Sequence, residues 1–306
     1  MTDQTLQIIE PEVTRLIDPD VTLERVADGF EFTEGPVWDY EQDELIFSDI
    51  PGDTMYRYTR TDGVSVYRSP TNFSNGMTID QRGQLIVCEH RTRRVVVGGR
   101  RGFETFVDNY GGTRLNAPND VIVAKDGSVI FTDPHYGLGE GFGGPADQEL
   151  SHRGVYRVPP GSREPELLAR DFDGPNGLAL TPDEQNLLVI DSEHGHIRSF
   201  SVGESWTLEG GDVLVTIDGD GDGVLDGMKL DHEGTIYSTG PGGIWISSPA
   251  GSILGRIRVP EVAANLAWGD ADGSTLYITA STGLYRVPTR TTGYVPHRTA
   301  TDRTLR

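Results

Sequence analysis

The stretch Gly127-Ser-Val-Ile-Phe-Thr-Asp133 is one of six related stretches in this 306-residue chain. Each copy starts at a turn residue, continues as a short apolar run and ends in a small or acidic residue. The other copies are Asp43–Asp49, Gly83–Glu89, Gln185–Asp191, Gly234–Thr239 and Ser274–Thr279. Their aligned apolar residues lie 40, 44, 58, 49 and 40 residues apart. A period of ~40–50 residues with several short strands in each unit is typical of a β-propeller.

Further strand patterns follow each copy. One is an aromatic or aliphatic residue followed by Arg, as in Val155-Tyr-Arg-Val158, and an outer strand comes next, as in Asp212–Thr216. Only five outer strands follow the six units, so the missing one is expected at Val21–Val26. The sequence therefore predicts an all-β, six-bladed propeller with four-stranded blades, whose last blade is closed by the N-terminal strand. A β-sandwich also has regular short strands, but the repeat period disfavours it.

The repeats also suggest the domain organisation. Residues 1–20 are expected to form an N-terminal extension, 21–290 a single propeller domain and 291–306 a C-terminal tail. The longest interval between copies contains an insertion, residues 135–153, which reads HYGLGEGFGGPADQELSHR. This Gly-rich segment has no strand period. It is expected to be either a lid or binding loop, or an ordered excursion on the surface.

Composition excludes several classes of function. The formal charge is 26 − 47 = −21, and such an acidic surface repels nucleic acid. No apolar run approaches ~18 residues, so no membrane span is expected, and Met1–Val13 lacks the features of a signal peptide. Cys88 is the one cysteine, so no intrachain disulfide can form. We expect a cytoplasmic protein, and the oligomeric state is left open.

Oxygen-bearing side chains recur where the first strand of each unit begins. They are Glu34, Asn75, Asn119, Asn176, Asp226 and Asn265, spaced 41, 44, 57, 50 and 39 residues apart. Rotational repetition would place them in one ring around the central channel. Oxygen donors of this kind suit a hard cation, and Ca²⁺ is the first expectation. Each residue alone could simply cap an Asx turn. Asn75 and Asn265 could support the ligands or contact a substrate.

A competing cation motif lies close to this ring. Asp218-Gly-Asp-Gly-Asp-Gly223 resembles the start of an EF-hand loop, with Asp226 at the ninth position. The twelfth position is Lys229, where an EF-hand has a bidentate Glu, and no helices flank the segment. A turn that leads into the channel strand is the preferred interpretation.

Four motifs carry a resemblance to a known family. They are Phe32-Thr-Glu-Gly-Pro-Val-Trp38, Asn116-Ala-Pro-Asn-Asp120 with Phe131-Thr-Asp-Pro134, Gly174-Pro-Asn-Gly-Leu178 and Asp222-Gly-Val-Leu-Asp-Gly-Met228. From about Ala27 to Val287 the chain resembles the SMP-30/gluconolactonase-like family. The resemblance implies a six-bladed propeller with a catalytic divalent metal, usually Ca²⁺, and hydrolysis of sugar lactones. The implied metal ligands are Glu34, Asn176 and Asp226, with Asn119 as a ligand or a substrate contact.

The chain departs from the family pattern at two places. Some animal members have a substrate-binding Arg two residues before the Asn of the Asn-Asp pair, where this chain has Ala117. Arg114 is a candidate substitute. The bacterial branch often has Pro where this chain has His135, which either faces the channel mouth or lies on the insertion.

The expected reaction is the opening of a small, gluconolactone-like lactone by metal-activated water. Asp226 is the first candidate for the base that takes the proton of that water, and Asp120 is the second. No Gly-x-Ser-x-Gly motif is present, which disfavours a serine nucleophile. Two alternatives stay open: an organophosphate hydrolase that uses the same metal, and a non-catalytic propeller with a structural metal. Mn²⁺, Fe²⁺, Zn²⁺ or Mg²⁺ could replace Ca²⁺.

Overall fold

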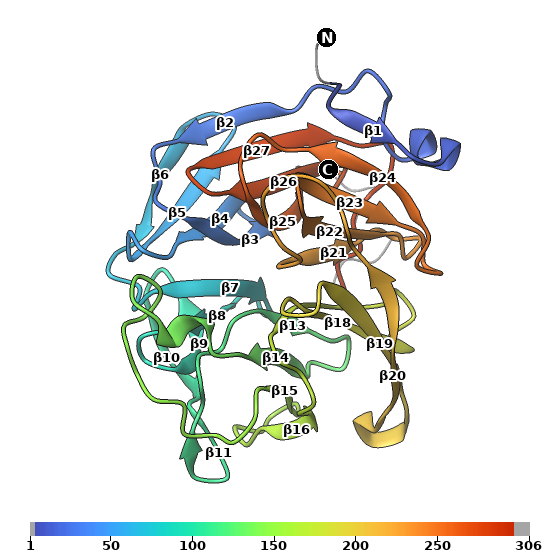
Figure 1. Ribbon diagram of the computed structural model, residues 1–306. Coiled ribbons are helices and arrows are strands. Elements are labelled where there is room, and N and C mark those ends of the chain that lie inside the picture. The colour runs from blue at the N-terminus through green and yellow to red at the C-terminus, as the bar shows by residue number, and fades with distance from the viewer. Residues whose placement is uncertain (1–3, 297–306) are drawn as a thin grey trace.

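The computed structural model describes residues 4–296, and six small antiparallel sheets lie around a central axis in it (Figure 1). The first sheet contains β3 (Thr33–Asp39), β4 (Glu44–Asp49), β5 (Thr54–Thr59) and β6 (Gly63–Arg68). The second contains β7 (Ser74–Ile79), β8 (Leu85–Glu89), β9 (Arg94–Gly99) and β10 (Gly102–Val107). The third contains β13 (Val121–Val123), β14 (Val129–Asp133), β15 (Gly154–Val158) and β16 (Glu166–Ala169).

The remaining sheets complete the circle. The fourth contains β17 (Pro175–Leu180), β18 (Asn186–Asp191), β19 (His196–Val202) and β20 (Leu208–Thr216). The fifth contains β21 (Met228–Leu230), β22 (Ile236–Gly240), β23 (Gly243–Ser247) and β24 (Ile253–Arg258). The sixth contains β25 (Ala263–Gly269), β26 (Thr275–Ala280) and β27 (Gly283–Pro288). The predicted all-β, six-bladed propeller with four-stranded blades is confirmed.

The N-terminal segment contributes to two blades. β2 (Glu24–Asp28) pairs with β27 as the outermost strand of the sixth blade, so the predicted closure is confirmed, three residues later in the chain than the pattern indicated. β1 (Leu6–Ile8) adds a fifth strand to the outer edge of the fifth blade by pairing with β24. The sequence pattern missed β1 because it is only 3 residues long. Residues 1–3 and 297–306 of the expected terminal segments lie outside the described residues.

Short elements make up most of the rest. A two-stranded hairpin, β11 (Asn109–Tyr110) with β12 (Thr113–Arg114), connects the second and third blades. Three 3₁₀ turns are described in residues 4–296: η1 (Pro11–Arg15), η2 (Tyr136–Leu138) and η3 (Glu204–Trp206). No helix in this range is long and apolar enough to cross a membrane.

The core lies between neighbouring blades and not within any single sheet. Ile46 and Met55 of the first blade pack in one cluster with Met77 and Val87 of the second. Every residue of β4 and of β14 is buried, because each of these strands is covered on both faces. Such strands contain apolar residues on both faces, which explains the continuous apolar runs in the repeat. Burial between blades also fixes the rotation that brings the inner strands to one axis.

Candidate functional site

The six predicted ring residues lie at or just before the start of the inner strands. Glu34, Asn75, Asn176 and Asn265 lie on β3, β7, β17 and β25, whereas Asn119 and Asp226 lie two residues before the start of β13 and β21. Register shifts follow Glu34 in β3 and Ser74 in β7, and similar shifts occur in β17 and β25. Such bulges re-aim a side chain at the end of a strand. They turn the ring side chains out of the regular alternation of the sheet.

Backbone hydrogen bonds join the ring from blade to blade. The N–H of Gly76 donates to the carbonyl of Asn119 at 2.8 Å, and the N–H of Gly177 donates to the carbonyl of Asp226 at 2.7 Å. A Cβ atom at Gly76 would lie 2.5 Å from the Asn119 oxygen, so only glycine permits this approach. The Asn-Gly pairs of the sequence therefore bring neighbouring inner strands close together, and with them the ring side chains.

The acidic residue that ends several repeats holds the loop leading into the ring. Asp49 accepts the N–H of Phe32 at 3.0 Å, two residues before Glu34. Asp191 accepts the N–H of Gly174 at 2.9 Å, two residues before Asn176. Asp133 likewise accepts the N–H of Asn116 at 2.8 Å, and burial raises the pKa of Asp133 to about 7. These carboxylates position the ring and belong to its support.

Two acidic ring members, Glu34 and Asp226, lie close enough for their charges to interact. Glu34 is buried, and burial together with the charge of Asp226 raises its pKa well above the usual value. Asn265 Nδ2 donates to Glu34 Oε2 at 3.0 Å, and the N–H of Gly35 donates to the same oxygen. Burial and the nearby charge of Asp120 raise the pKa of Asp226 to about 7, against the lowering effect of the Asn176 amide. Neighbouring carboxylates of this kind are relieved by a bound cation.

Asp120 lies beside the ring and next to a lysine from another blade. Its Oδ1 accepts the N–H of Val121 at 2.9 Å, whereas its buried Oδ2 has no hydrogen-bond partner among residues 4–296. The Nζ of Lys229 is 3.9 Å from that Oδ2 and donates to the carbonyl of Met228 at 3.1 Å. Sequence reasoning missed this role of Lys229, although it is one of only two lysines in the chain.

The ring offers the donor set of a hard cation. Asn176 Nδ2 donates to Ser192 Oγ at 3.0 Å, and Ser192 Oγ donates to the carbonyl of Leu225 at 2.5 Å. Because the Asn176 nitrogen is engaged in this way, its Oδ1 is left as the free acceptor. Two carboxylates with amide oxygens fit the preferences of Ca²⁺. No cluster of three or more His, Cys, Asp or Glu side chains suited to a metal occurs in the described part of the chain, which disfavours a zinc-type site.

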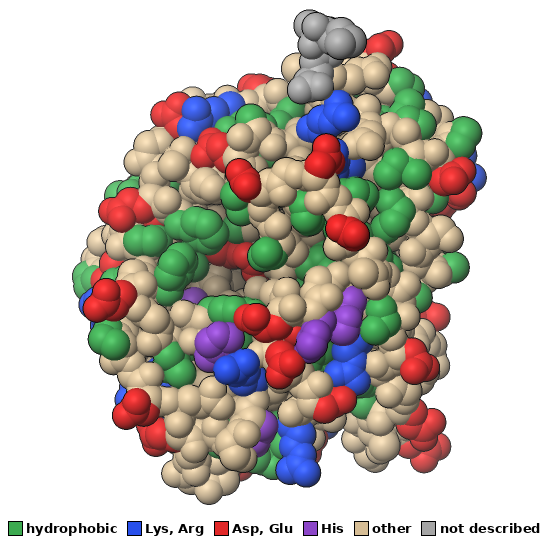
Figure 2. Space-filling view, in the orientation of Figure 1, with side chains coloured by type: hydrophobic (Ala, Val, Ile, Leu, Met, Phe, Trp, Pro, Cys, Tyr) green, Lys and Arg blue, Asp and Glu red, His purple; other side chains and the backbone are tan. Residues whose placement is uncertain are grey.

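Histidine and tyrosine side chains from the loop after β8 and from η2 complete the surroundings of the ring. Acidic side chains gather near the centre of the face shown in Figure 2, and histidine side chains flank them. His90, which sequence reasoning missed, is buried, and its Nε2 lies 3.3 Å from Asn75 Nδ2. The Tyr136 hydroxyl donates to Glu193 Oε1 at 3.1 Å, and burial raises the pKa of this tyrosine. A Cβ atom at Gly174 would lie 2.1 Å from the Tyr136 hydroxyl, so the insertion reaches the loop before Asn176.

The observed contacts of the two remaining candidate substrate residues, Arg114 and His135, are not with ring residues. Arg114 is exposed on β12, and its NH2 donates to the carbonyl of Thr92 at 2.9 Å, so its observed partner is not a ring residue. His135 lies at the start of η2 and is half-buried, with its ring 4.6 Å from that of Tyr136. Burial and Arg153 lower the pKa of His135, and its Nδ1 lacks a hydrogen-bond partner within the described chain.

A separate cavity of about 300 Å³ lies at the other end of the inner strands. Its walls are mainly apolar and include Val37, Ile79, Val123, Leu180, Leu230 and Trp268. None of the six ring residues lines it, and Lys229 is the basic residue in its wall. The six ring residues therefore lie outside this cavity.

Comparisons with known proteins agree with this architecture. Residues 32–282 match the family model described as the SMP-30/gluconolactonase/LRE-like region. A gluconolactonase of Zymomonas mobilis is 34% identical over 307 residues, covering 92% of this chain and 85% of that protein. A pentonolactonase of Haloferax volcanii is 28% identical over 280 residues, covering 86% of each chain. The solved structure of a gluconolactonase from Xanthomonas campestris superposes with a TM-score of 0.87 at 32% identity, covering 93% of this chain and 94% of that chain.

Proposed function

The chain belongs to the SMP-30/gluconolactonase/LRE-like family, and we propose that it hydrolyses a small sugar lactone at the ring with the help of one divalent metal ion. The observation that carries this proposal is the proximity of two carboxylates, the buried Glu34 and the half-buried Asp226, whose pKa values are raised by desolvation and by neighbouring carboxylate charge. A cation held by Glu34, Asn119, Asn176 and Asp226 would relieve that repulsion. The relatives that act on gluconolactone and pentonolactone support the substrate class.

When bound, the cation would polarise the lactone carbonyl and stabilise the negative charge that develops on its oxygen. The protein's own groups orient the reactants. Asn265 fixes Glu34 through the 3.0 Å hydrogen bond, and Ser192 fixes Asn176. This support leaves the ring side chains little freedom to rotate, as a preorganised site requires.

Asp226 is the proposed base that accepts the proton of the attacking water. Asp226 is half-buried and thus more exposed than Asp120. Asp120 is the second candidate, but it is only 2% exposed and lies 3.9 Å from Lys229, which compensates its charge. A neutral lactone also fits the ring better than an anionic phosphate monoester, because Lys229, the basic group at Asp120, is already paired.

Proton release on mixing with glucono-1,5-lactone, corrected for spontaneous hydrolysis, tests the activity. EDTA should abolish the enzymatic rate, and adding back Ca²⁺, Mn²⁺, Mg²⁺, Zn²⁺ or Fe²⁺ one at a time should identify the native ion. The Asp226→Asn variant should lose at least about 100-fold in rate if the base contributes as general bases usually do. Asp222→Asn makes the same change four residues earlier at an exposed position and serves as the matched control.

Metal content must be measured in each variant by mass spectrometry. If Asp226→Asn kept its metal and its turnover, the base would be Asp120 or another group. If the wild type hydrolysed no lactone in the presence of any ion, the proposed activity itself would be wrong.

A further inference from the structure

A line of contacts connects the insertion to one ring residue through His90. The Nδ1 of His90 lies 2.7 Å from the carbonyl oxygen of Phe142, which belongs to the Gly-rich insertion. The Nε2 of the same ring lies 3.3 Å from Nδ2 of Asn75. His90 is 1% exposed and Asn75 is 4% exposed, so neither contact competes with bulk water.

These contacts determine which way the Asn75 amide points. A carbonyl oxygen only accepts hydrogen bonds, so the His90 nitrogen facing Phe142 must carry the proton. In neutral imidazole the other nitrogen is then an acceptor, and burial favours the neutral form. Asn75 must therefore present its NH₂ group to His90 and direct Oδ1 away from it. That buried Oδ1 has no hydrogen-bond partner in residues 4–296.

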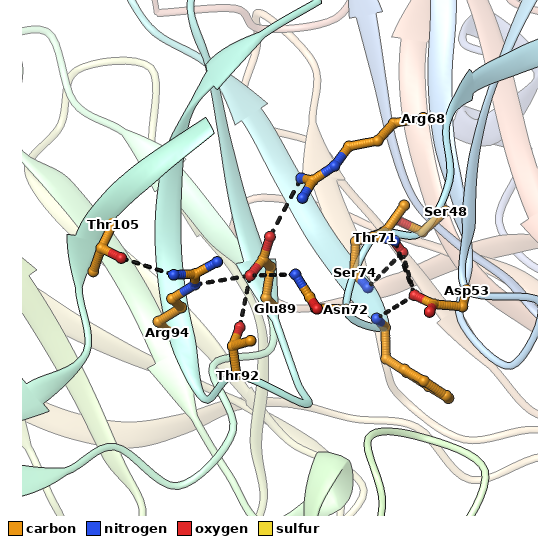
Figure 3. Close-up of polar contacts among 11 residues, drawn as sticks. Ser48, Asp53, Arg68, Thr71, Asn72, Ser74, Glu89, Thr92, Arg94 and Thr105 are labelled. Atoms are coloured by element: carbon orange, nitrogen blue, oxygen red, sulfur yellow. Dashed lines mark hydrogen bonds and ion pairs between the residues drawn. The ribbon is translucent and has the colours of Figure 1, made fainter. Parts of the chain in front are cut away.

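The surrounding structure holds both residues in place. Figure 3 shows Glu89, the residue before His90, receiving hydrogen bonds from Asn72 at 3.2 Å, Thr92 at 2.6 Å and Arg94 at 2.9 Å. The same view shows Asp53 accepting the hydroxyl of Thr71 at 3.0 Å in the loop before Asn75. Hydrogen bonds therefore hold in place both chain segments that form the contact between His90 and Asn75.

The insertion packs directly on the imidazole ring. A Cβ atom at Gly137 would lie 2.4 Å from Cγ of His90, so only a glycine fits there. The rings of Phe142 and Phe32 meet edge to face at 5.6 Å, two residues before Glu34. Arg93 NH1 bonds Glu149 Oε1 at 2.9 Å further along the insertion.

We infer that His90 is a positioning residue, which fixes the Asn75 carboxamide so that Oδ1 accepts a hydrogen bond from a hydroxyl group of the substrate in the channel. The inference rests on the proposed lactonase function for its ligand, but the orientation of Asn75 does not depend on that function. It adds a hydroxyl-recognition role to a ring whose acidic members are proposed to bind a cation. An acceptor without a partner in a buried site selects a ligand that carries a donor, because a ligand without one leaves it unpaired.

Two isosteric variants separate the two contacts of His90. In His90→Asn the amide nitrogen occupies the place of Nδ1, which keeps the Phe142 contact and removes the acceptor for Asn75. In His90→Gln the amide oxygen occupies the place of Nε2, which keeps the acceptor and removes the Phe142 contact. His232→Asn, an exposed histidine in the turn after β21, controls for the substitution itself.

The readout is the ratio of kcat/KM for glucono-1,5-lactone to that for δ-valerolactone, which has the same ring without hydroxyl groups. His90→Asn should lower this ratio about fivefold, mainly through KM, because one hydrogen bond between neutral groups is lost. His90→Gln should keep the ratio within about twofold of wild type. Asn75→Ala should lower it as far as His90→Asn, and the double variant should lower it no further.

An equal fall of both activities in His90→Asn would show a merely structural role and overturn the inference. So would an unchanged ratio, or additive losses in the double variant.

A second measurement is independent of turnover. Long-range ¹H–¹⁵N spectra of protein labelled with ¹⁵N-histidine report which nitrogen carries the proton, and His90→Gln assigns the signal. The Nδ1–H tautomer is expected at neutral pH, and the Nε2–H tautomer would refute the orientation of Asn75. If wild type opened neither lactone, the proposed function and the hydroxyl contact would fail together, while the tautomer would still decide the orientation of Asn75.

Discussion

Acid should destabilise this protein partly through His90. Burial lowers the pKa of His90 to about 4 from its ordinary value of 6.5, because the charged imidazolium would lose its hydration. Between these two values the unfolded chain binds a proton that the folded chain does not bind. The free energy of unfolding must therefore fall as the pH falls through 6.5, and this loss is complete below 4.

The expected size follows from the two pKa values. The full difference of 2.5 units corresponds to about 3 kcal/mol, and about 2 kcal/mol of it should be lost between pH 7.5 and pH 5. His90→Gln has no titrating group, so its stability should lack this component. The variant also loses the hydrogen bond to Phe142, which adds a constant cost of about 1 kcal/mol that does not change with pH.

Urea unfolding of wild type and His90→Gln at pH 7.5, 6.5, 5.5 and 5.0 measures this difference. EDTA is present throughout, so that metal binding does not contribute to the pH dependence. The stability of wild type relative to His90→Gln should fall by about 2 kcal/mol between pH 7.5 and pH 5, so that the two curves cross. Parallel curves would show that His90 titrates equally in the folded and unfolded chains, and the reasoning from burial would then be refuted.

Other predictions concern the core, the closure and the metal. Phe47→Ala should destabilise the fold by about 3–5 kcal/mol in urea unfolding, whereas Val66→Ala at a 59% exposed position should stay within about 0.5 kcal/mol. Removing residues 1–28 deletes β1 and β2, and the truncated chain should aggregate in light scattering because two sheet edges are opened. Saturating Ca²⁺ at 100 times its Kd should add about 2.7 kcal/mol to wild-type stability, and Glu34→Gln should show much less of this gain in thermal unfolding.

The sequence by itself determined the architecture and the position of the ring residues within each repeat. The repeat relates each blade to the next by one rotation, so a residue at the same place in every repeat returns at the same height on the axis. That is why Glu34, Asn75 and Asp226 could be placed together from their spacing alone. The Asn-Gly pairs were also informative, because the N–H groups of Gly76 and Gly177 donate the hydrogen bonds that join neighbouring inner strands. The roles of the ring residues in binding and catalysis stay predictions.

Some contacts involve residues that do not recur in the repeat, and only the tertiary structure revealed them. Lys229 reaches Asp120 across two blades, and β1 adds to the fifth blade, although the pattern indicated only a strand for the sixth. The contact of His90 with Phe142 joins residues 52 positions apart through a loop without strand period. Such pairings depend on how irregular loops pack against a finished surface, and no spacing in the sequence encodes that packing. Repetition therefore determined where the ring residues lie, whereas loop packing decided how the Asn75 amide is turned.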